Sequence, residues 1–159
     1  MSSHVELPTA EDTRALGRRL GSRLRAGDLV VLTGDLGAGK TTFTQGLGEG
    51  LGVRGPVTSP TFVIARVHPS TVGGPALVHV DAYRLGDGAE LDDLDLDTSL
   101  EESVTVVEWG EGLAEVLAQD RVEVLLRRSG SDAADDQTRT AVLRGRGRRW
   151  AQAVLEEER

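Results

Sequence analysis

Residues 34 to 41, Gly-Asp-Leu-Gly-Ala-Gly-Lys-Thr, match the pattern G-x-x-x-x-G-K-[ST] in full. The run before them, Asp28 to Gly34, is short, β-branched and apolar, as buried parallel strands are. The residues from Thr41 to about Leu51 have a helical pattern. A glycine-rich turn between a buried strand and a helix directs backbone N–H groups and the positive helix N-terminus at phosphates. This stretch therefore predicts an α/β fold with a phosphate-binding loop.

Lys40 is the only lysine among the 18 basic residues of the chain; all the others are arginine. A lysine ammonium is compact and flexible, which suits a position among phosphate oxygens better than a planar guanidinium does. We expect Lys40 to reach the β- and γ-phosphates and the Thr41 hydroxyl to ligate Mg²⁺. The alternative is a glycine-rich turn that binds nothing.

Two carboxylates, Asp81 and Glu108, each follow an apolar run, at residues 77–80 and 104–107. Parallel strands in such sheets end at the same edge, so either carboxylate can face the phosphates. A phosphate loop needs an acid of this kind to hold Mg²⁺ directly or through water. Taken alone, each acid reads more easily as a solvated strand end, but the phosphate loop favours the magnesium role.

The N-terminal part of the chain predicts a helix. Thr9 can cap it, and Asp12 stands where the acid of a capping box would. Three leucines then recur at the four-residue spacing of one helical face, namely Leu16, Leu20 and Leu24. We expect Gly27 to end this helix.

The remaining segments predict a mixed order of strands and helices. In the second helix, every glycine lowers helix stability by about 1 kcal/mol relative to alanine; they are Gly46, Gly48, Gly50 and Gly52. We expect a hairpin or neighbouring strands at 57–67 and 76–85, short helices at 87–102, strands at 103–109, 121–128 and 138–145, and helices at 112–118 and 148–158. Residues 1–159 then form one phosphate-loop domain, a three-layer α/β sandwich with a mixed, partly parallel central sheet.

Charge and composition exclude several function classes. The net charge of −8 argues against direct binding to DNA or RNA, because phosphate-backbone affinity depends on clustered Lys and Arg. The sequence has no cysteine, no secretory signal and no apolar run near the ~20 residues of a membrane span, so we expect a cytoplasmic protein that does not bind membranes. Eight acids at 87–102 and five arginines at 139–149 indicate solvated faces or, alternatively, partner docking.

The base of the nucleotide leaves a weaker signal. The chain has no asparagine, so the N-K-x-D element of guanine-specific proteins is impossible and adenine is the expected base. Its expected contacts are the first helix, through Thr13, and the arginines Arg127 and Arg128 at a strand end. A surface-charge role for the two arginines is the alternative.

Four motifs together resemble the TsaE family, also called YjeE. They are "GDLGAGKTT" (34–42), "TSPTF" (58–62), "HVDAYRL" (79–85) and "VEWGE" (107–111), in the order and spacing of that family. The resemblance runs from about Thr13 to about Arg128. Gly110 stands where the family often has proline, and the segment after "TSPTF" lacks the usual tyrosine.

The resemblance implies an ATPase that uses Mg²⁺ and acts with the proteins TsaB and TsaD in threonylcarbamoyladenosine modification of tRNA, so that it meets tRNA only through the complex. Gly37, Ala38, Gly39, Lys40, Thr41 and Thr42 match the phosphate-binding stretch. Thr41 and Glu108 match the magnesium-associated residues, Thr61 resembles a switch threonine, and Asp81 matches an acid that orients water or ligates magnesium. Trp109 matches the family's tryptophan beside the acid, or alternatively it is a packing residue.

Two other functions use the same loop. A small-molecule kinase would need an acceptor pocket and an arginine-rich lid, and the arginines at 139–149 lie too near the C-terminus for such a lid. A nucleotide-gated interaction protein would use binding as its output, with the 58–62 segment responding to the γ-phosphate. No arginine finger stands out in the chain, so we expect slow hydrolysis without partners.

Overall fold

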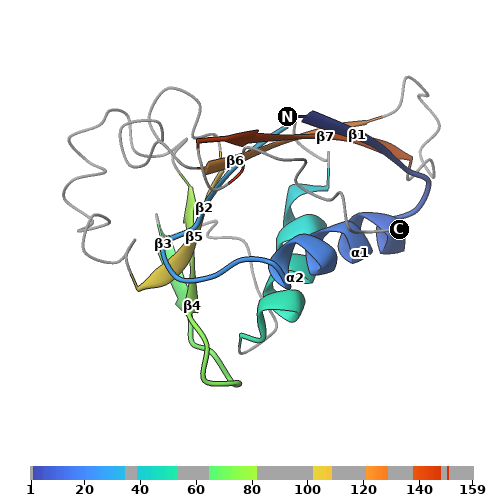
Figure 1. The fold of residues 1–159 in the computed structure, drawn as a ribbon. Coiled ribbons are helices and arrows are strands. Elements are labelled where there is room, and N and C mark those ends of the chain that lie inside the picture. Colours follow the sequence, from blue (N-terminus) through green and yellow to red (C-terminus); the bar gives the residue numbers. More distant parts are fainter. Residues whose placement is uncertain are drawn as a thin grey trace.

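The residues that the structure describes form one seven-stranded sheet with two helices (Figure 1). The computed structural model describes residues 2–34, 39–53, 65–81, 102–108, 121–128, 138–147 and 150. The helices are α1 (Ala10–Gly21) and α2 (Lys40–Leu51). The strands are β1 (Ser2–Leu7), β2 (Leu29–Gly34), β3 (Ala65–His68), β4 (Ala76–Asp81), β5 (Ser103–Glu108), β6 (Arg121–Arg128) and β7 (Arg139–Arg146). Neither described helix has the length and apolarity that crossing a membrane requires.

The sheet is mixed, with strand order β1-β7-β6-β2-β5-β4-β3. The four central strands β6, β2, β5 and β4 run parallel, whereas β7, β1 and β3 pair antiparallel to their neighbours. All six residues of β5 are buried, which is the pattern of a central parallel strand covered on both faces. The predicted partly parallel sheet, its central strands and the hairpin of β3 and β4 are confirmed.

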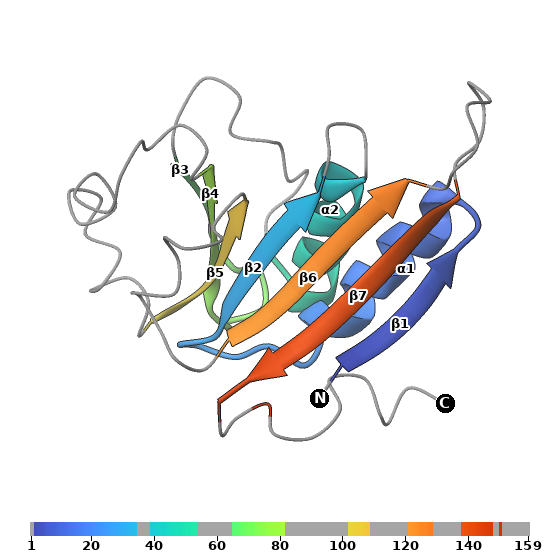
Figure 2. The same ribbon diagram turned by 90° about the horizontal axis from the view of Figure 1, so that it is seen from above.

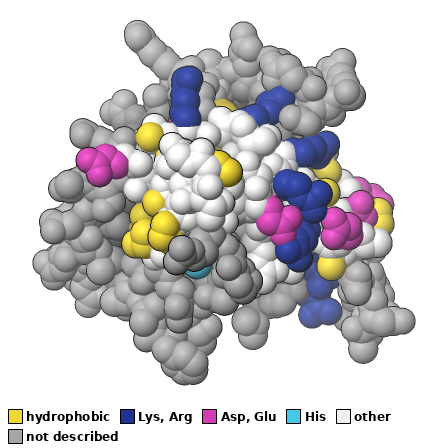
Figure 3. Space-filling model, turned by 90° about the horizontal axis from the view of Figure 1, so that it is seen from below, with side chains coloured by type: hydrophobic (Ala, Val, Ile, Leu, Met, Phe, Trp, Pro, Cys, Tyr) yellow, Lys and Arg dark blue, Asp and Glu magenta, His cyan; other side chains and the backbone are white. Residues whose placement is uncertain are grey.

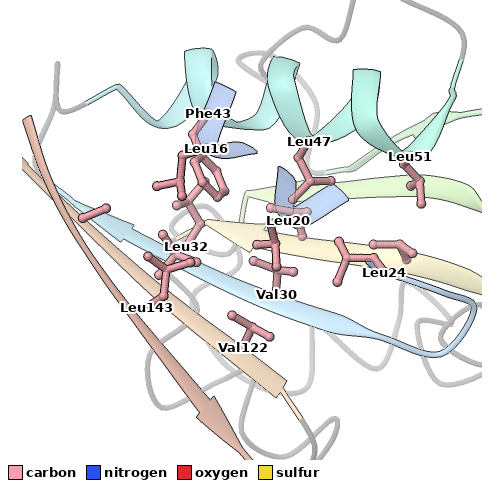
Figure 4. Packing of buried hydrophobic residues seen from close by; sticks show 14 of the residues in the cluster. Leu16, Leu20, Leu24, Val30, Leu32, Phe43, Leu47, Leu51, Val122 and Leu143 are labelled. Atoms are coloured by element: carbon pink, nitrogen blue, oxygen red, sulfur yellow. The ribbon is translucent and has the colours of Figure 1, made fainter. Parts of the chain in front are cut away.

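Helices α1 and α2 lie together on one face of the sheet, as Figures 1 and 2 show. Their leucines and Phe43 meet alternate residues of the strands in one apolar core (Figure 4). Among those strand residues are Val30, Leu32, Val122 and Leu143. The mixed α/β class is confirmed, whereas the helices expected at 87–102, 112–118 and most of 148–158 lie outside the described residues.

Helix α1 begins as predicted but ends earlier. The Thr9 side chain accepts a hydrogen bond from the Asp12 N–H while the Asp12 carboxylate accepts one from the Thr9 N–H, a complete capping box. The expected end at Gly27 is wrong, because the helix stops at Gly21. Beyond it the backbone tightens into i→i+3 hydrogen bonds, and a turn closed by Arg25 N–H and the Asp28 carboxylate leads into β2. Gly27, at φ +96°, belongs to that turn.

Strand β1 was not among the predicted elements. It pairs antiparallel with β7 at the edge of the sheet, from Ser2 opposite Arg144 to Leu7 opposite Arg139. Leu7 is buried and Val5 packs against the core, whereas the intervening Glu6 is exposed. So short an alternation, with only two apolar residues, is a weak strand signal, and the strand depends on β7 for its pairing.

Glycines set the distance between α1 and α2. A Cβ built on Gly46 would lie 2.0 Å from the Arg14 carbonyl oxygen, and one on Gly50 would lie 2.1 Å from that of Arg18. From the other side, a Cβ on Gly17 would lie 2.1 Å from the Phe43 oxygen. Each helix therefore packs against the bare backbone of the other. The glycines that weaken α2 as an isolated helix are the ones that allow this contact.

Candidate nucleotide site at the carboxyl edge of the sheet

The parallel strands bring the predicted acids to one edge. In register, Glu108 of β5 lies opposite Leu32 of β2 on one side and opposite Asp81 of β4 on the other. Gly34, where the phosphate loop begins, is the last residue of β2. Gly34, Asp81 and Glu108 therefore end neighbouring strands at the same edge, as the sequence predicted.

Lys40 is the first residue of α2 and connects the two ends of the phosphate loop. Its Nζ donates a hydrogen bond to the Gly34 carbonyl oxygen, 2.8 Å away. The residue before it, Gly39, has φ +98°, a left-handed conformation that glycine adopts without a steric penalty. Gly39 also accepts the first helical hydrogen bond, from Phe43 N–H. Lys40 therefore links the end of β2 to the N-terminus of α2.

Two threonines follow Lys40 in the first turn of α2. Thr41 is exposed and Thr42 is half-buried. The next threonine, Thr44, is buried and donates its hydroxyl hydrogen to the Lys40 carbonyl oxygen, so it stabilises the turn instead of facing solvent. Thr41 is therefore the most exposed of the threonines in this turn.

Glu108 is held by a histidine that the sequence reading did not assign. His79 Nε2 lies 2.9 Å from Glu108 Oε2, and the two side chains are 0% and 8% exposed. A buried carboxylate without a hydrogen-bond partner is strongly destabilising, so the contact with His79 offsets part of the cost of burying Glu108. The available signal was a histidine inside the apolar run 77–80, where a buried polar side chain needs a partner.

The oxygen donors at this edge fit a hard cation. Within the described ranges no cluster of three or more His, Asp or Glu side chains is placed to bind a metal. Mg²⁺, however, is commonly held by one or two protein ligands together with waters and substrate phosphates. The contact with His79 involves only Oε2 of Glu108. Glu108 and Thr41 therefore supply a carboxylate and a hydroxyl oxygen of the kind that Mg²⁺ prefers, each at this edge of the sheet.

Thr13 and Arg139 border the loop from two other elements. A Cβ built on Gly39 would lie 3.5 Å from Thr13 Cγ2 and 4.0 Å from Arg139 Cγ. Thr13, from α1, is buried, and Arg139 opens β7 opposite Arg128. The structure thus places Thr13 beside Gly39, and its expected contact with adenine stays a prediction. Arg139 was not singled out by the sequence, because only the pairing of β6 with β7 brings it to this edge.

Arg127, the residue before the last one of β6, lies near the same edge but on the other face of the sheet. Leu126, its neighbour, lies opposite Gly34 and belongs to the core beneath α1 and α2, so Arg127 points to the opposite side, where it is exposed. Its predicted contact with adenine stays a prediction. The other predicted residues, Gly37, Ala38, Thr61 and Trp109, lie outside the described residues, and Asp81 is placed by its backbone alone.

Comparisons with known proteins agree on one family. Residues 7–139 match the family model described as "Threonylcarbamoyl adenosine biosynthesis protein TsaE". The chain is 64% identical over 141 residues to the tRNA threonylcarbamoyladenosine biosynthesis protein TsaE of Streptomyces coelicolor, covering 88% of this chain and 95% of that protein. It is 42% identical to the TsaE protein of Bacillus subtilis, covering 77% and 75%. The crystal structure of Bacillus subtilis YdiB superposes with a TM-score of 0.77 at 32% identity, covering 99% of this chain and 93% of that one.

Proposed function

The chain belongs to the TsaE family of threonylcarbamoyl adenosine biosynthesis proteins, and from this we propose that it is the magnesium-dependent ATPase of a tRNA threonylcarbamoyladenosine modification complex. In this proposal it binds and hydrolyses ATP and drives turnover of TsaB and TsaD homologues, which carry out the transfer to tRNA. The observation that carries the proposal is the joint placement of Lys40, Gly34 and Glu108 at one edge of the sheet.

The residues of the site have distinct roles in this proposal. Lys40 neutralises phosphate charge at the N-terminus of α2, where the helix dipole also favours anions. Thr41 and Glu108 hold the magnesium ion, and His79 keeps the Glu108 carboxylate in one orientation. Magnesium, when bound, offsets the negative charge that develops on the phosphate oxygens. The side chains of Thr13 and Arg139 lie beside the loop at Gly39.

Reconstitution tests the whole proposal. The purified protein is added to its TsaB and TsaD homologues with tRNA, ATP and an activated threonylcarbamoyl donor, and modified adenosine is counted per enzyme over time. We expect repeated cycles only when the chain is present. If its omission changes nothing, the assignment to this complex fails even when ATP binds.

Glu108→Gln isolates the metal role. The amide keeps the shape and a hydrogen bond to His79 but loses the charge, so we expect ATP to bind while hydrolysis falls at least about a hundredfold. Glu102→Gln is the matched control, because Glu102 is an exposed glutamate just before the same strand. Equal hydrolysis by the Glu108 variant and the wild type would contradict the assignment. Loss of hydrolysis with full function in the complex would instead favour a nucleotide-gated interaction protein.

A further inference from the structure

The sheet face opposite α1 and α2 carries a hollow that the nucleotide site does not use. It lies over β2, β6 and β7, on the side of the sheet that faces the viewer in Figure 2, and has a volume of about 420 Å³. Its apolar floor includes Val31, Leu125 and Val142. Four arginines and one acid line it as well, namely Arg121, Arg127, Arg144, Arg146 and Glu123. The hollow is therefore cationic in a protein whose net charge is −8.

Of the arginines in the hollow, two form ion pairs with described residues and the other two do not. The Glu123 carboxylate is held by Arg121 at 2.9 Å and by Arg146 at 3.5 Å. Arg127 and Arg144 are both exposed, and within the described chain neither guanidinium has an ion pair. On the opposite side of the molecule, by contrast, arginine and acidic side chains lie against one another (Figure 3); Arg14 and Arg18 are both paired with Glu49 there. Two arginines of the hollow are thus left without an acidic partner among the described residues.

The strand register fixes the spacing of these two arginines. Arg127 lies opposite Thr140, Leu125 opposite Val142, and Glu123 opposite Arg144. Arg127 and Arg144 are therefore four residues apart along the strands, about 13 Å at ~3.3 Å per residue. The apolar pair Leu125 and Val142 lies midway between them. In order, the surface presents a cation, an apolar patch and a second cation.

We propose that this hollow docks an extended segment of a partner protein that carries an acid, an apolar residue and a second acid at positions i, i+2 and i+4. In an extended chain these three side chains point to the same face and span the same length of about 13 Å. The two carboxylates meet Arg127 and Arg144, while the apolar side chain covers Leu125 and Val142. Bidentate pairing with carboxylates is the geometry to which guanidinium is suited.

A nucleic acid fits the hollow less well. Phosphate-backbone affinity grows with the number of cations neutralised, and two unpaired arginines supply few. The net charge of −8 also repels a long polyanion beyond the hollow. A short acidic segment avoids this repulsion, because the interaction acts within the screening length of about 8 to 10 Å.

Two synthetic peptides of equal composition test the proposal. The patterned peptide is Ser-Asp-Ser-Leu-Ser-Asp-Ser, with blocked ends, and the control peptide is Ser-Ser-Leu-Asp-Asp-Ser-Ser, whose acids point to opposite faces when extended. Binding to the full chain is measured by titration calorimetry or fluorescence anisotropy without nucleotide. We expect the patterned peptide to bind about tenfold more tightly and to weaken as salt rises. Equal binding of the two peptides would overturn the proposal.

Arginine variants locate the binding. Arg144→Gln and Arg127→Gln should each lower the affinity for the patterned peptide about tenfold, whereas Arg25→Gln, an exposed arginine in the turn before β2, should change it less than about twofold. Urea unfolding of each variant checks that the fold is kept. Parallel titrations use ATP, unmodified tRNA and inorganic phosphate. Peptide binding that survives both variants, displacement of the peptide by millimolar phosphate, or tighter binding of tRNA than of peptide through Arg144 would each overturn the proposal.

Discussion

Helix α2 belongs to two regions that are built differently. Its first residue, Lys40, lies at the polar carboxyl edge of the sheet, where the Lys40 ammonium donates to the Gly34 carbonyl oxygen and the Glu108 carboxylate contacts His79. Its body, from Gly46 to Gly50, packs against α1 through bare backbone. Polar side chains form the contacts of the first region, whereas glycines without side chains allow the close helix packing of the second. A substitution in one should therefore change activity, and a substitution in the other should change stability.

Substitution of Lys40 should lower activity most strongly while changing stability little. Lys40→Met removes the ammonium from the phosphates, so ATP hydrolysis in the presence of the partner proteins should fall roughly a hundredfold to a thousandfold. The free energy of unfolding should fall by only about 2 kcal/mol, the order of one hydrogen bond from a charged donor, here the bond to Gly34. Steady-state phosphate release and urea unfolding measure the two quantities.

Lys40→Arg sharpens this test. The variant keeps the positive charge but replaces a compact ammonium by a wide planar group, so we expect hydrolysis to stay low. Full activity with arginine would show that charge alone is required at this position, and the presence of a single lysine in the chain would then need another explanation.

Gly46→Ala should produce the reverse pattern. The added Cβ would stand 2.0 Å from the Arg14 carbonyl oxygen, so the helices must move apart, at a cost of about 1–3 kcal/mol. Alanine returns about 1 kcal/mol of helix propensity, and we expect a net loss of stability all the same. Thermal or urea unfolding measures it, with Gly74→Ala as the control, because a Cβ there meets nothing closer than 3.8 Å. Unchanged stability of the Gly46 variant would show that the close approach is dispensable.

A third test asks whether His79 belongs to the site or only to the core. In a double-mutant cycle of His79→Leu and Glu108→Gln, the two side chains should show a coupling energy of about 1 kcal/mol, since their contact is buried and short. His79→Leu should also weaken magnesium-dependent nucleotide binding at fixed ATP, which a purely structural residue would not do. Additive losses of stability together with unchanged magnesium dependence would assign His79 to the core alone.

Sequence reasoning reached the polar edge more completely than the helix pair. The strand before Gly34 and the helix after Gly39 follow from local patterns, because they are consecutive in the chain, and the place of Glu108 follows from the rule that parallel strands end at one edge. The role of Gly46 and Gly50 does not, since local propensity reports only that glycine weakens a helix. His79 and Arg139 likewise become site residues only through pairing between distant strands. The end of α1 was misplaced because Gly27 serves a turn and not a helix cap.

The smallest effect is expected at the outer rim of the helix pair. Glu49 of α2 accepts hydrogen bonds from Arg14 and Arg18 of α1. The hydrogen bond from Arg14 is the largest effect on the pKa of the Glu49 carboxyl and holds it below its ordinary value of 4.5. Desolvation acts in the opposite direction, and the positive charge of Arg14 lowers the pKa further. A lowered pKa in the folded state means that the contribution is present above pH 4.5 and is lost as the pH falls through the folded-state pKa.

Glu49→Gln should therefore lower the melting temperature at pH 7 by less than about 3 °C, because all three side chains are more than a third exposed to solvent. The difference from the wild type should shrink below pH 4.5 and in high salt, where protonation and screening remove the same interaction. Glu6→Gln, an exposed acid on β1, is the control for a simple change in net charge. A Glu49 effect as large as that of Gly46→Ala would mean that side-chain charge, and not backbone contact, holds α1 against α2.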